Sequence, residues 1–192
     1  MDDNQLIAEL ATKLDAAIVM FGWSFIVIQK NDPNQQGIPS SGTAVFFEKL
    51  FDIPYGTSIT KNYFDEGQGE FKELETQVYQ SHFQISALVQ QNVNDLSVPT
   101  ALDVVNKLKM YLGSRNILWD LGSRGIGILR ISDVVNPPMT NDKDLIQQHP
   151  SFDMVFTYIK SIEFVVPYVT EVEGVEIPIS NINGFDGNGQ PI

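Results

Sequence analysis

The sequence predicts an α+β fold in which an antiparallel or mixed β-sheet carries two main helices packed on one face. Two segments, residues 2–21 and 100–112, place apolar residues at helical spacing. The longer segments between and after them are rich in β-branched and aromatic residues, which favour strands. Because the helical segments do not alternate with every strand, a doubly wound parallel sheet is disfavoured.

The first helix is expected from Asp2 to about Phe21. Two acidic residues at its start suit the positive end of the helix dipole, and Gly22 is a plausible stop. A short strand is expected over residues 23–28. The apolar stripe of the helix consists of Leu6, Ile7, Leu10, Leu14, Ala17 and Ile18.

The next strand is expected over residues 43–51, which read TAVFFEKLF. Residues 52–69 are polar and contain three glycines, so they are interpreted either as a mobile loop or as a β-hairpin that extends from the body. Residues 73–89 nearly alternate apolar and polar side chains, which makes them the clearest strand of the sequence.

The second helix opens near Pro99 and Thr100 and ends at Gly113, with Ser97 as a possible N-cap. The side chains expected on its buried face are Leu102, Val105, Leu108 and Leu112.

The remaining sequence predicts further strands and an extended end. Residues 116–121 are expected to form a short helix or turn, and residues 125–135 a strand. A polar loop is expected up to His149, followed by a long strand over residues 152–166. Residues 169–179 are interpreted as an extended arm, so that one domain spans residues 1–179 and a flexible tail spans 180–192.

Composition limits the possible functions. The 192 residues include no cysteine, which excludes disulfides, thiolate catalysis and cysteine-ligated zinc. The formal net charge of −12 argues against a basic nucleic-acid-binding face, because phosphate binding needs clustered Lys and Arg. No apolar run approaches the ~20 residues needed to span a bilayer, so no membrane contact is expected.

No pattern of catalytic, cofactor-binding or metal-ligating residues stands out. The two histidines, His82 and His149, have no partner at metal-ligand spacing, and no phosphate loop or nucleophile elbow is found. The acidic residues between 65 and 75 are interpreted as a solvated segment. The sequence therefore predicts a non-enzymatic protein without cofactor or metal; an enzyme or a small-molecule-binding domain is the less favoured alternative.

The order and character of the elements resemble a family of phage structural proteins. An alternating strand (QVYQSHFQISALVQQN, 77–92) precedes an apolar helix (TALDVVNKLKMYL, 100–112). A short aromatic turn at 117–119 leads to a glycine-flanked strand (GIGILRIS, 125–132), and a long strand follows (SFDMVFTYIKSIEFVVPYV, 151–169). The chain thus resembles the neck and tail-terminator proteins of tailed bacteriophages over about 130 residues, with residues 31–74 departing from the pattern.

The resemblance implies a homo-oligomeric ring, with six subunits as the expectation, that caps the tail tube and presents a docking face to the head-neck connector. The expected partners are the tail tube protein, the connector or neck protein and the sheath protein, with genomic DNA passing through the lumen without specific binding. The implied location is the tail or neck of the virion, after assembly in the host cytoplasm. Another head-tail connector, a tail-tube subunit or a baseplate subunit is the alternative within the same class.

Residues 52–72 and 167–192 are the expected subunit-interface segments, because extended loops and arms can add strands to a neighbouring sheet edge. The candidate interface residues in these segments are Tyr55, Tyr63, Phe64, Phe71, Tyr168, Val172, Val175 and Ile177.

Overall fold

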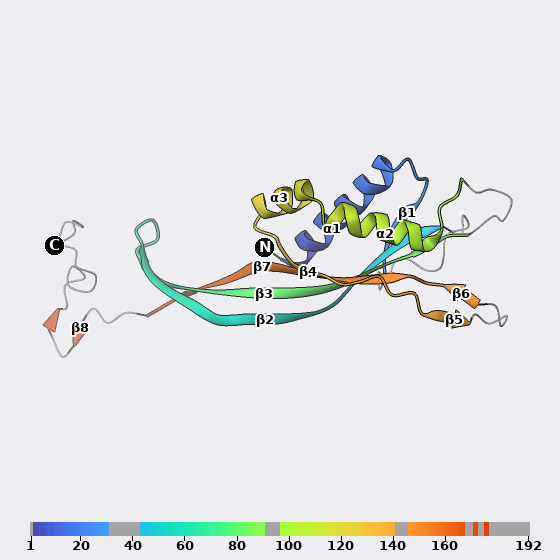
Figure 1. Cartoon of the computed structure of the whole chain (residues 1–192). Coiled ribbons are helices and arrows are strands. Elements are labelled where there is room, and N and C mark those ends of the chain that lie inside the picture. Colours follow the sequence, from blue (N-terminus) through green and yellow to red (C-terminus); the bar gives the residue numbers. More distant parts are fainter. Residues whose placement is uncertain are drawn as a thin grey trace. The chain divides into compact units, whose positions relative to one another are not determined.

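The computed structural model describes residues 2–30, 43–90, 97–140, 146–167, 171–172 and 175–176. Their helices and strands confirm the predicted α+β class, with a third helix in addition to the two main ones (Figure 1). The helices are α1 (Asp3–Met20), α2 (Ala101–Leu112) and α3 (Arg115–Ser123). The strands are β1 (Ile26–Gln29), β2 (Ala44–Asp65), β3 (Glu70–Leu88), β4 (Gly127–Ile131), β5 (Pro138–Thr140), β6 (Ile146–Gln148), β7 (Ser151–Val165), β8 (Glu171–Val172) and β9 (Val175–Glu176).

Five strands form one mixed sheet in the order β1-β2-β3-β7-β4, so β1 and β4 are its edges. β1 runs parallel to β2, with Ile26 opposite Ala44. β4 runs antiparallel to β7 and contains a register shift between Ile128 and Arg130. β5 pairs with β6, and β8 with β9, in two separate two-stranded sheets.

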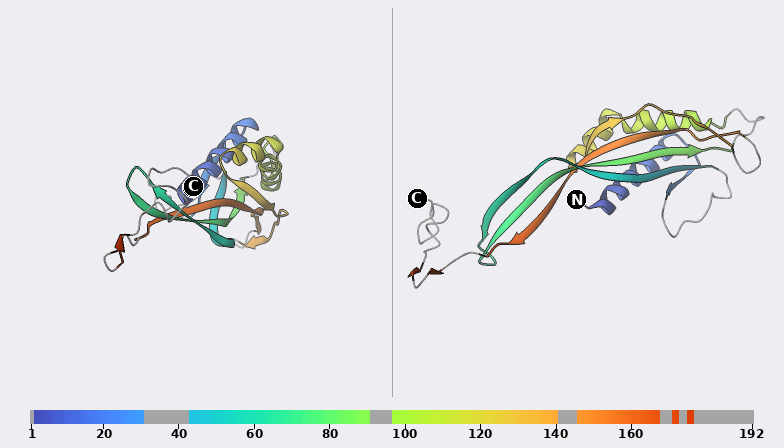
Figure 2. Two further views of the ribbon diagram at one scale, coloured as in Figure 1. Left: turned by 90° about the vertical axis from the view of Figure 1, so that its left-hand side faces the viewer. Right: turned by 90° about the horizontal axis from the view of Figure 1, so that it is seen from below.

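The chain divides into two compact units, and each is described by itself. Unit 1 comprises residues 1–57 and 77–160, and unit 2 comprises residues 58–76 and 161–192. Unit 1 therefore contains the three helices, β1 and β4, whereas unit 2 contains the turn between β2 and β3, the end of β7 and the β8–β9 pair. The strands β2, β3 and β7 are neighbours in the sheet, as the right-hand view of Figure 2 shows, and have residues in both units.

The hydrophobic core of unit 1 lies between the helices and one face of the sheet, and Figure 1 shows all three helices on that side. Phe83 of β3 and Phe156 of β7 meet edge to face at the centre, with ring centroids 5.5 Å apart. The buried side chains that α1 contributes are Leu6, Leu10, Leu14, Ala17 and Ile18, which are members of the predicted stripe. The buried side chains of α2 are Ala101, Val104, Val105, Leu108 and Leu112.

Both main helices begin with a capping box, in which the first residue and the third helical residue satisfy each other's backbone N–H groups. Asp2 and Gln5 form this pair at α1, and Thr100 and Asp103 form it at α2. The expectation that Ser97 caps α2 is therefore wrong, because the helix starts three residues later. The expectation that Leu102 is buried is also wrong: it is 36% exposed, and Val104 takes its place in the core.

The strands differ from the sequence prediction in three places. Residues 52–65 belong to β2, so the hairpin interpretation is correct and the mobile-loop interpretation is wrong. The turn at 66–69 closes because Asp65 accepts backbone hydrogen bonds from Gly67 and Gln68, while Gly69 adopts a positive φ of 69°. The predicted strand 125–135 is shorter, and the predicted loop up to His149 contains the β5–β6 pair.

We predict that Leu108→Ala lowers the free energy of unfolding by about 2–5 kcal/mol, because it leaves a cavity in the core. Leu102→Ala removes the same atoms from an exposed position of the same helix, so we expect a change below about 1 kcal/mol. Urea denaturation of both variants measures the difference. Equal losses would contradict the assignment of the buried face of α2.

Candidate functional site

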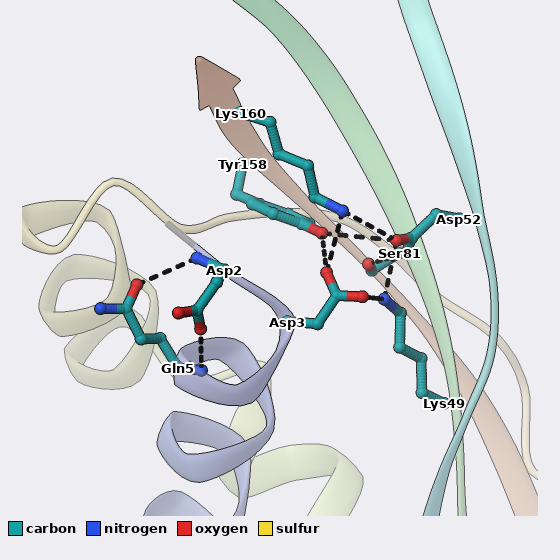
Figure 3. A network of polar contacts seen from close by, with 8 residues as sticks. All are labelled: Asp2, Asp3, Gln5, Lys49, Asp52, Ser81, Tyr158 and Lys160. Carbon is teal, nitrogen blue, oxygen red and sulfur yellow. Dashed lines mark hydrogen bonds and ion pairs between the residues drawn. The ribbon is translucent and has the colours of Figure 1, made fainter. Parts of the chain in front are cut away.

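A connected set of charged side chains lies in unit 1 where the start of α1 meets the sheet (Figure 3). Lys49 Nζ lies 2.6 Å from a carboxylate oxygen of Asp3 and 2.7 Å from one of Asp52. Lys160 Nζ lies 2.9 Å from Asp3 and 3.3 Å from Asp52. Two carboxylates and two ammonium groups therefore alternate, and their formal charges cancel.

Two buried hydroxyl groups complete this polar cluster. Tyr158, at the core side of β7, donates a hydrogen bond of 2.7 Å to Asp3. Ser81 of β3 is fully buried and donates to Asp52. The Lys160 ammonium also lies 4.7 Å from the ring centroid of Tyr79, so β2, β3 and β7 all contribute to the cluster.

The pKa values in the cluster shift so that every group keeps its usual charge. Burial by itself raises the pKa of Asp3 and of Asp52, but hydrogen bonds from the lysines and hydroxyls outweigh it and hold both pKa values below their ordinary range. Burial by itself lowers the pKa of Lys49 and of Lys160. The neighbouring carboxylates raise both pKa values by more, so each shows a net rise. Burial and the hydrogen bond to Asp3 raise the pKa of Tyr158.

This cluster has the properties of a structural clamp. A general acid or base needs a pKa near the working pH and access to a substrate proton. Here the pKa values of both carboxylates lie below their ordinary range, and both groups are already hydrogen-bonded or ion-paired to protein groups. The cluster therefore stabilises the position of α1 on the sheet, and its chemistry offers no proton transfer at neutral pH.

The histidines lie apart from this cluster. His82 stacks on Phe51 with ring centroids 4.4 Å apart, and its Nε2 atom is buried and has no hydrogen-bond partner among the described residues. His149 is partly buried, and burial followed by the charge of Lys30 lowers its pKa. Within the described ranges, no three His, Asp or Glu side chains gather in a way that could hold a metal ion.

Large apolar side chains are exposed along β2 and β7, the two strands that flank β3. Exposed large apolar side chains that share one face of a strand are typical of a protein interaction site. The residues in unit 1 are Leu50, Phe51, Ile53, Tyr55 and Ile159. The residues in unit 2 are Ile59, Ile162, Phe164 and Val165.

The candidate interface residues of the β2–β3 hairpin have different surroundings. Tyr55 is 60% exposed in β2. In unit 2, Tyr63 donates a hydrogen bond to Glu163, and Phe64 packs against Phe71 with ring centroids 5.0 Å apart. Tyr63, Phe64 and Phe71 are partly buried, whereas Tyr55 is exposed and therefore presents more apolar surface to solvent than each of them.

An ion-pair network holds the strands of unit 2 together. The Lys72 ammonium lies 2.7 Å from Asp65 and 2.9 Å from Glu163, and these carboxylates raise its pKa. Thus Asp65, which was expected in a solvated acidic loop, pairs across the hairpin. The backbone N–H of Val166 donates to the carbonyl of Phe71 at 2.8 Å, which joins the end of β7 to β3.

The other four candidates lie at the C-terminal end of the chain. Val172 and Val175 pair as Cα partners in the β8–β9 ladder. Tyr168 and Ile177, like the tail 180–192, lie outside the described residues. As subunit-interface residues, all eight candidates remain predictions.

The exposed residues Ile59, Ile162, Phe164 and Val165 were not among the candidates. A usable signal was present in β7, where apolar residues occupy consecutive positions at 164 and 165. Neighbouring side chains of a strand point to opposite faces of the sheet. If the core covers only one face, one of these two side chains must point away from it.

A comparison with known protein families shows the family to which the chain belongs. The model of the family described as "E217 gateway protein gp29" matches residues 5–168. The chain belongs to this family. The match confirms the sequence-based assignment to the structural proteins of the phage neck and tail terminator, which places the chain in the virion.

A comparison with solved structures gives a more distant match. A solved structure, described as the sheath/tube terminator of an extracellular contractile injection system (PVC) in its extended state, is 13% identical to the gateway-family chain, with a TM-score of 0.42. The match covers 92% of the gateway-family chain and 65% of that terminator. No curated protein sequence matches. None of the described helices has the length and apolar character needed to cross a lipid bilayer.

We predict that Asp52→Asn lowers the free energy of unfolding by about 1–3 kcal/mol at pH 7, because it removes the charge that Lys49 and Lys160 share. The folded-state pKa of Asp52 lies below its ordinary value of 3.8. Its contribution is therefore present above about pH 4 and is lost as the pH falls through the folded-state pKa. Urea denaturation at pH 7 and pH 3 should show that the variant differs from the parent mainly at pH 7.

The matched control is Asp133→Asn, which neutralises a fully exposed carboxylate paired with Lys109. An exposed ion pair contributes little, so a change below about 0.5 kcal/mol is expected. A loss as large as that of Asp52→Asn would mean that net charge, and not the clamp, causes the effect.

Proposed function

We propose that this gateway-family chain is a tail terminator that assembles into a closed ring, caps the tail tube and forms the docking face for the head-neck connector. Family membership supports the tail and neck setting. The observation that carries the ring is the set of exposed apolar side chains on β2 and β7, the strands that flank β3.

Burial of these side chains would favour association. Each large apolar side chain gains roughly 1.5–3 kcal/mol when it moves fully from water into a packed interface. Nine such residues lie on two strands of one sheet, and a neighbouring copy could bury those that share a face. In a ring, one surface of each copy meets a different surface of the next, and closure then limits the assembly to a fixed number.

The ring mechanism requires binding surfaces and no bond chemistry. The charged cluster at the start of α1 stabilises the subunit, and the Lys72 network stabilises the hairpin. A rigid subunit loses little conformational entropy when it docks, which favours assembly. The proposed partners are the tail tube protein on one side, the connector or neck protein on the other, and the sheath protein.

The acidic balance of the chain suits a conduit for DNA. With a net charge of −12, a ring of several copies carries a large negative charge that repels phosphate. We propose that genomic DNA passes through the lumen without specific binding.

The purified chain is expected to form a closed ring, seen as one oligomeric species by size-exclusion chromatography with light scattering and as annular particles by negative-stain microscopy. We predict that Ile162→Asp shifts the species toward monomers, because it places a charge on the exposed apolar surface of β7. The variant should keep the circular dichroism spectrum of the parent.

Asn116→Asp is the matched control, since it adds the same charge at an exposed position of α3. The control should assemble like the parent. A parent chain that stays monomeric at high concentration would refute the ring.

A second experiment distinguishes a terminator from a tube subunit. Added to polymerising tail tube protein, the chain should shorten the tubes in proportion to its concentration and should be found at tube ends by immunogold labelling. Co-polymerisation along the tube wall would instead indicate a tube subunit, and absence from tube ends would indicate a connector that does not contact the tube.

A further inference from the structure

Four aromatic rings form a ladder where α1 ends and the chain enters β1. Phe21 and Trp23 have ring centroids 4.7 Å apart, and Trp23 stacks on Phe25 at 5.2 Å. Tyr111 of α2 meets Phe21 edge on at 6.2 Å. All four rings are partly buried against the core, so the ladder has one side on the core and one side accessible to solvent.

Strongly exposed apolar side chains adjoin this ladder. Val19 and Met20, which directly precede Phe21, are 78% and 69% exposed, and Met110, next to Tyr111, is 75% exposed. Exposed apolar side chains next in sequence to clustered aromatic rings have the composition of binding hot spots. We name this surface the α1–α2 patch and define it as Val19, Met20, Phe21, Trp23, Lys107 and Met110.

Lys107 gives the patch a positive charge. Its ammonium lies 5.8 Å from the ring centroid of Phe21 and 5.5 Å from that of Trp23. Within the described residues it forms no ion pair, whereas Lys49 and Lys72 each contact two carboxylates. The nearby Asp103 is hydrogen-bonded to Thr100 at the start of α2. The patch therefore suits an apolar segment that carries carboxylates.

The same chain contains a segment with this chemistry. Residues 168–179 read YVTEVEGVEIPI, in which valine and isoleucine alternate with three glutamates and no basic residue occurs. The part that the structure describes is the β8–β9 ladder, two residues on each side, in a sheet of its own. So short a two-stranded ladder is at best marginally stable alone, which favours docking on another surface.

We propose that residues 168–179 of one copy dock on the α1–α2 patch of a neighbouring copy. One of the glutamates pairs with Lys107, and the valine and isoleucine side chains cover Met20, Met110 and the accessible side of Trp23. The segment and the patch are different surfaces, so the contact is heterologous and can close a ring. The inference rests on the proposed ring, for which it supplies one subunit contact.

The first test uses a synthetic peptide of residues 168–179 and the fluorescence of Trp23. Trp119→Phe leaves Trp23 as the one tryptophan, because the sequence contains two. Titration should give a saturable change in Trp23 emission. We expect Lys107→Glu to weaken binding at least tenfold. Lys61→Glu changes the net charge equally at an exposed position of unit 2 and should bind like the parent.

The second test uses the absence of cysteine from the sequence. Copies with Met110→Cys and tagged copies with Val172→Cys are mixed and oxidised, and the mixed disulfide is detected on a non-reducing gel. We expect this product in the ring, and none when Asn116→Cys replaces Met110→Cys.

The outcomes separate the docking contact from the ring. A ring without the mixed disulfide, or a patch whose peptide binding ignores Lys107→Glu, overturns the contact and leaves the proposed terminator standing. A monomeric chain whose patch binds the peptide refutes the ring and supports the docking site. A monomeric chain that does not bind the peptide overturns both.

Discussion

The charge-balanced clamp of Asp3, Lys49, Asp52 and Lys160 determines how α1 sits on the sheet of unit 1. An isolated charge at the edge of a core costs desolvation free energy. In this cluster each charge lies 2.6–3.3 Å from charges of opposite sign, so the four charges balance. Because Asp3 is the first residue of α1, the clamp positions the stripe that continues through Leu6, Leu10 and Leu14.

Along β7, the apolar residues before the clamp are buried, and those after it are exposed. On β7, Phe152, Met154, Phe156 and Tyr158 are buried, while Ile162 and Phe164 continue the same alternation and are exposed. The chemistry of the strand stays the same, but within the described residues no side chain covers the later positions to the same extent. Exposing such apolar surface to water costs free energy, and burial of the surface by a neighbouring copy would recover that free energy.

In this gateway-family chain, ion pairs and exposed apolar side chains have different roles. Titratable groups are used to hold elements together, as in the clamp and in the Lys72 network, and their shifted pKa values keep them charged at neutral pH. The accessible surface includes exposed apolar side chains on β2 and β7 and an aromatic ladder beside the ammonium of Lys107. This distribution fits a protein whose function lies in its contacts with other proteins.

The sequence by itself determined the α+β class, both main helices and the long strands, because helical stripes and strand alternation are local patterns. It also led to the correct family, through the order of those elements. It misplaced Leu102, because only packing in the folded protein decides that Val104 enters the core, and it missed the N-cap of α2, although Thr100 and Asp103 form a local capping box. Only the tertiary structure decided that β1 is parallel to β2, that Asp3 joins Lys49 and Lys160, and that the apolar residues of late β7 are exposed. These features depend on residues far apart in the chain, and no local spacing encodes which distant side chains meet.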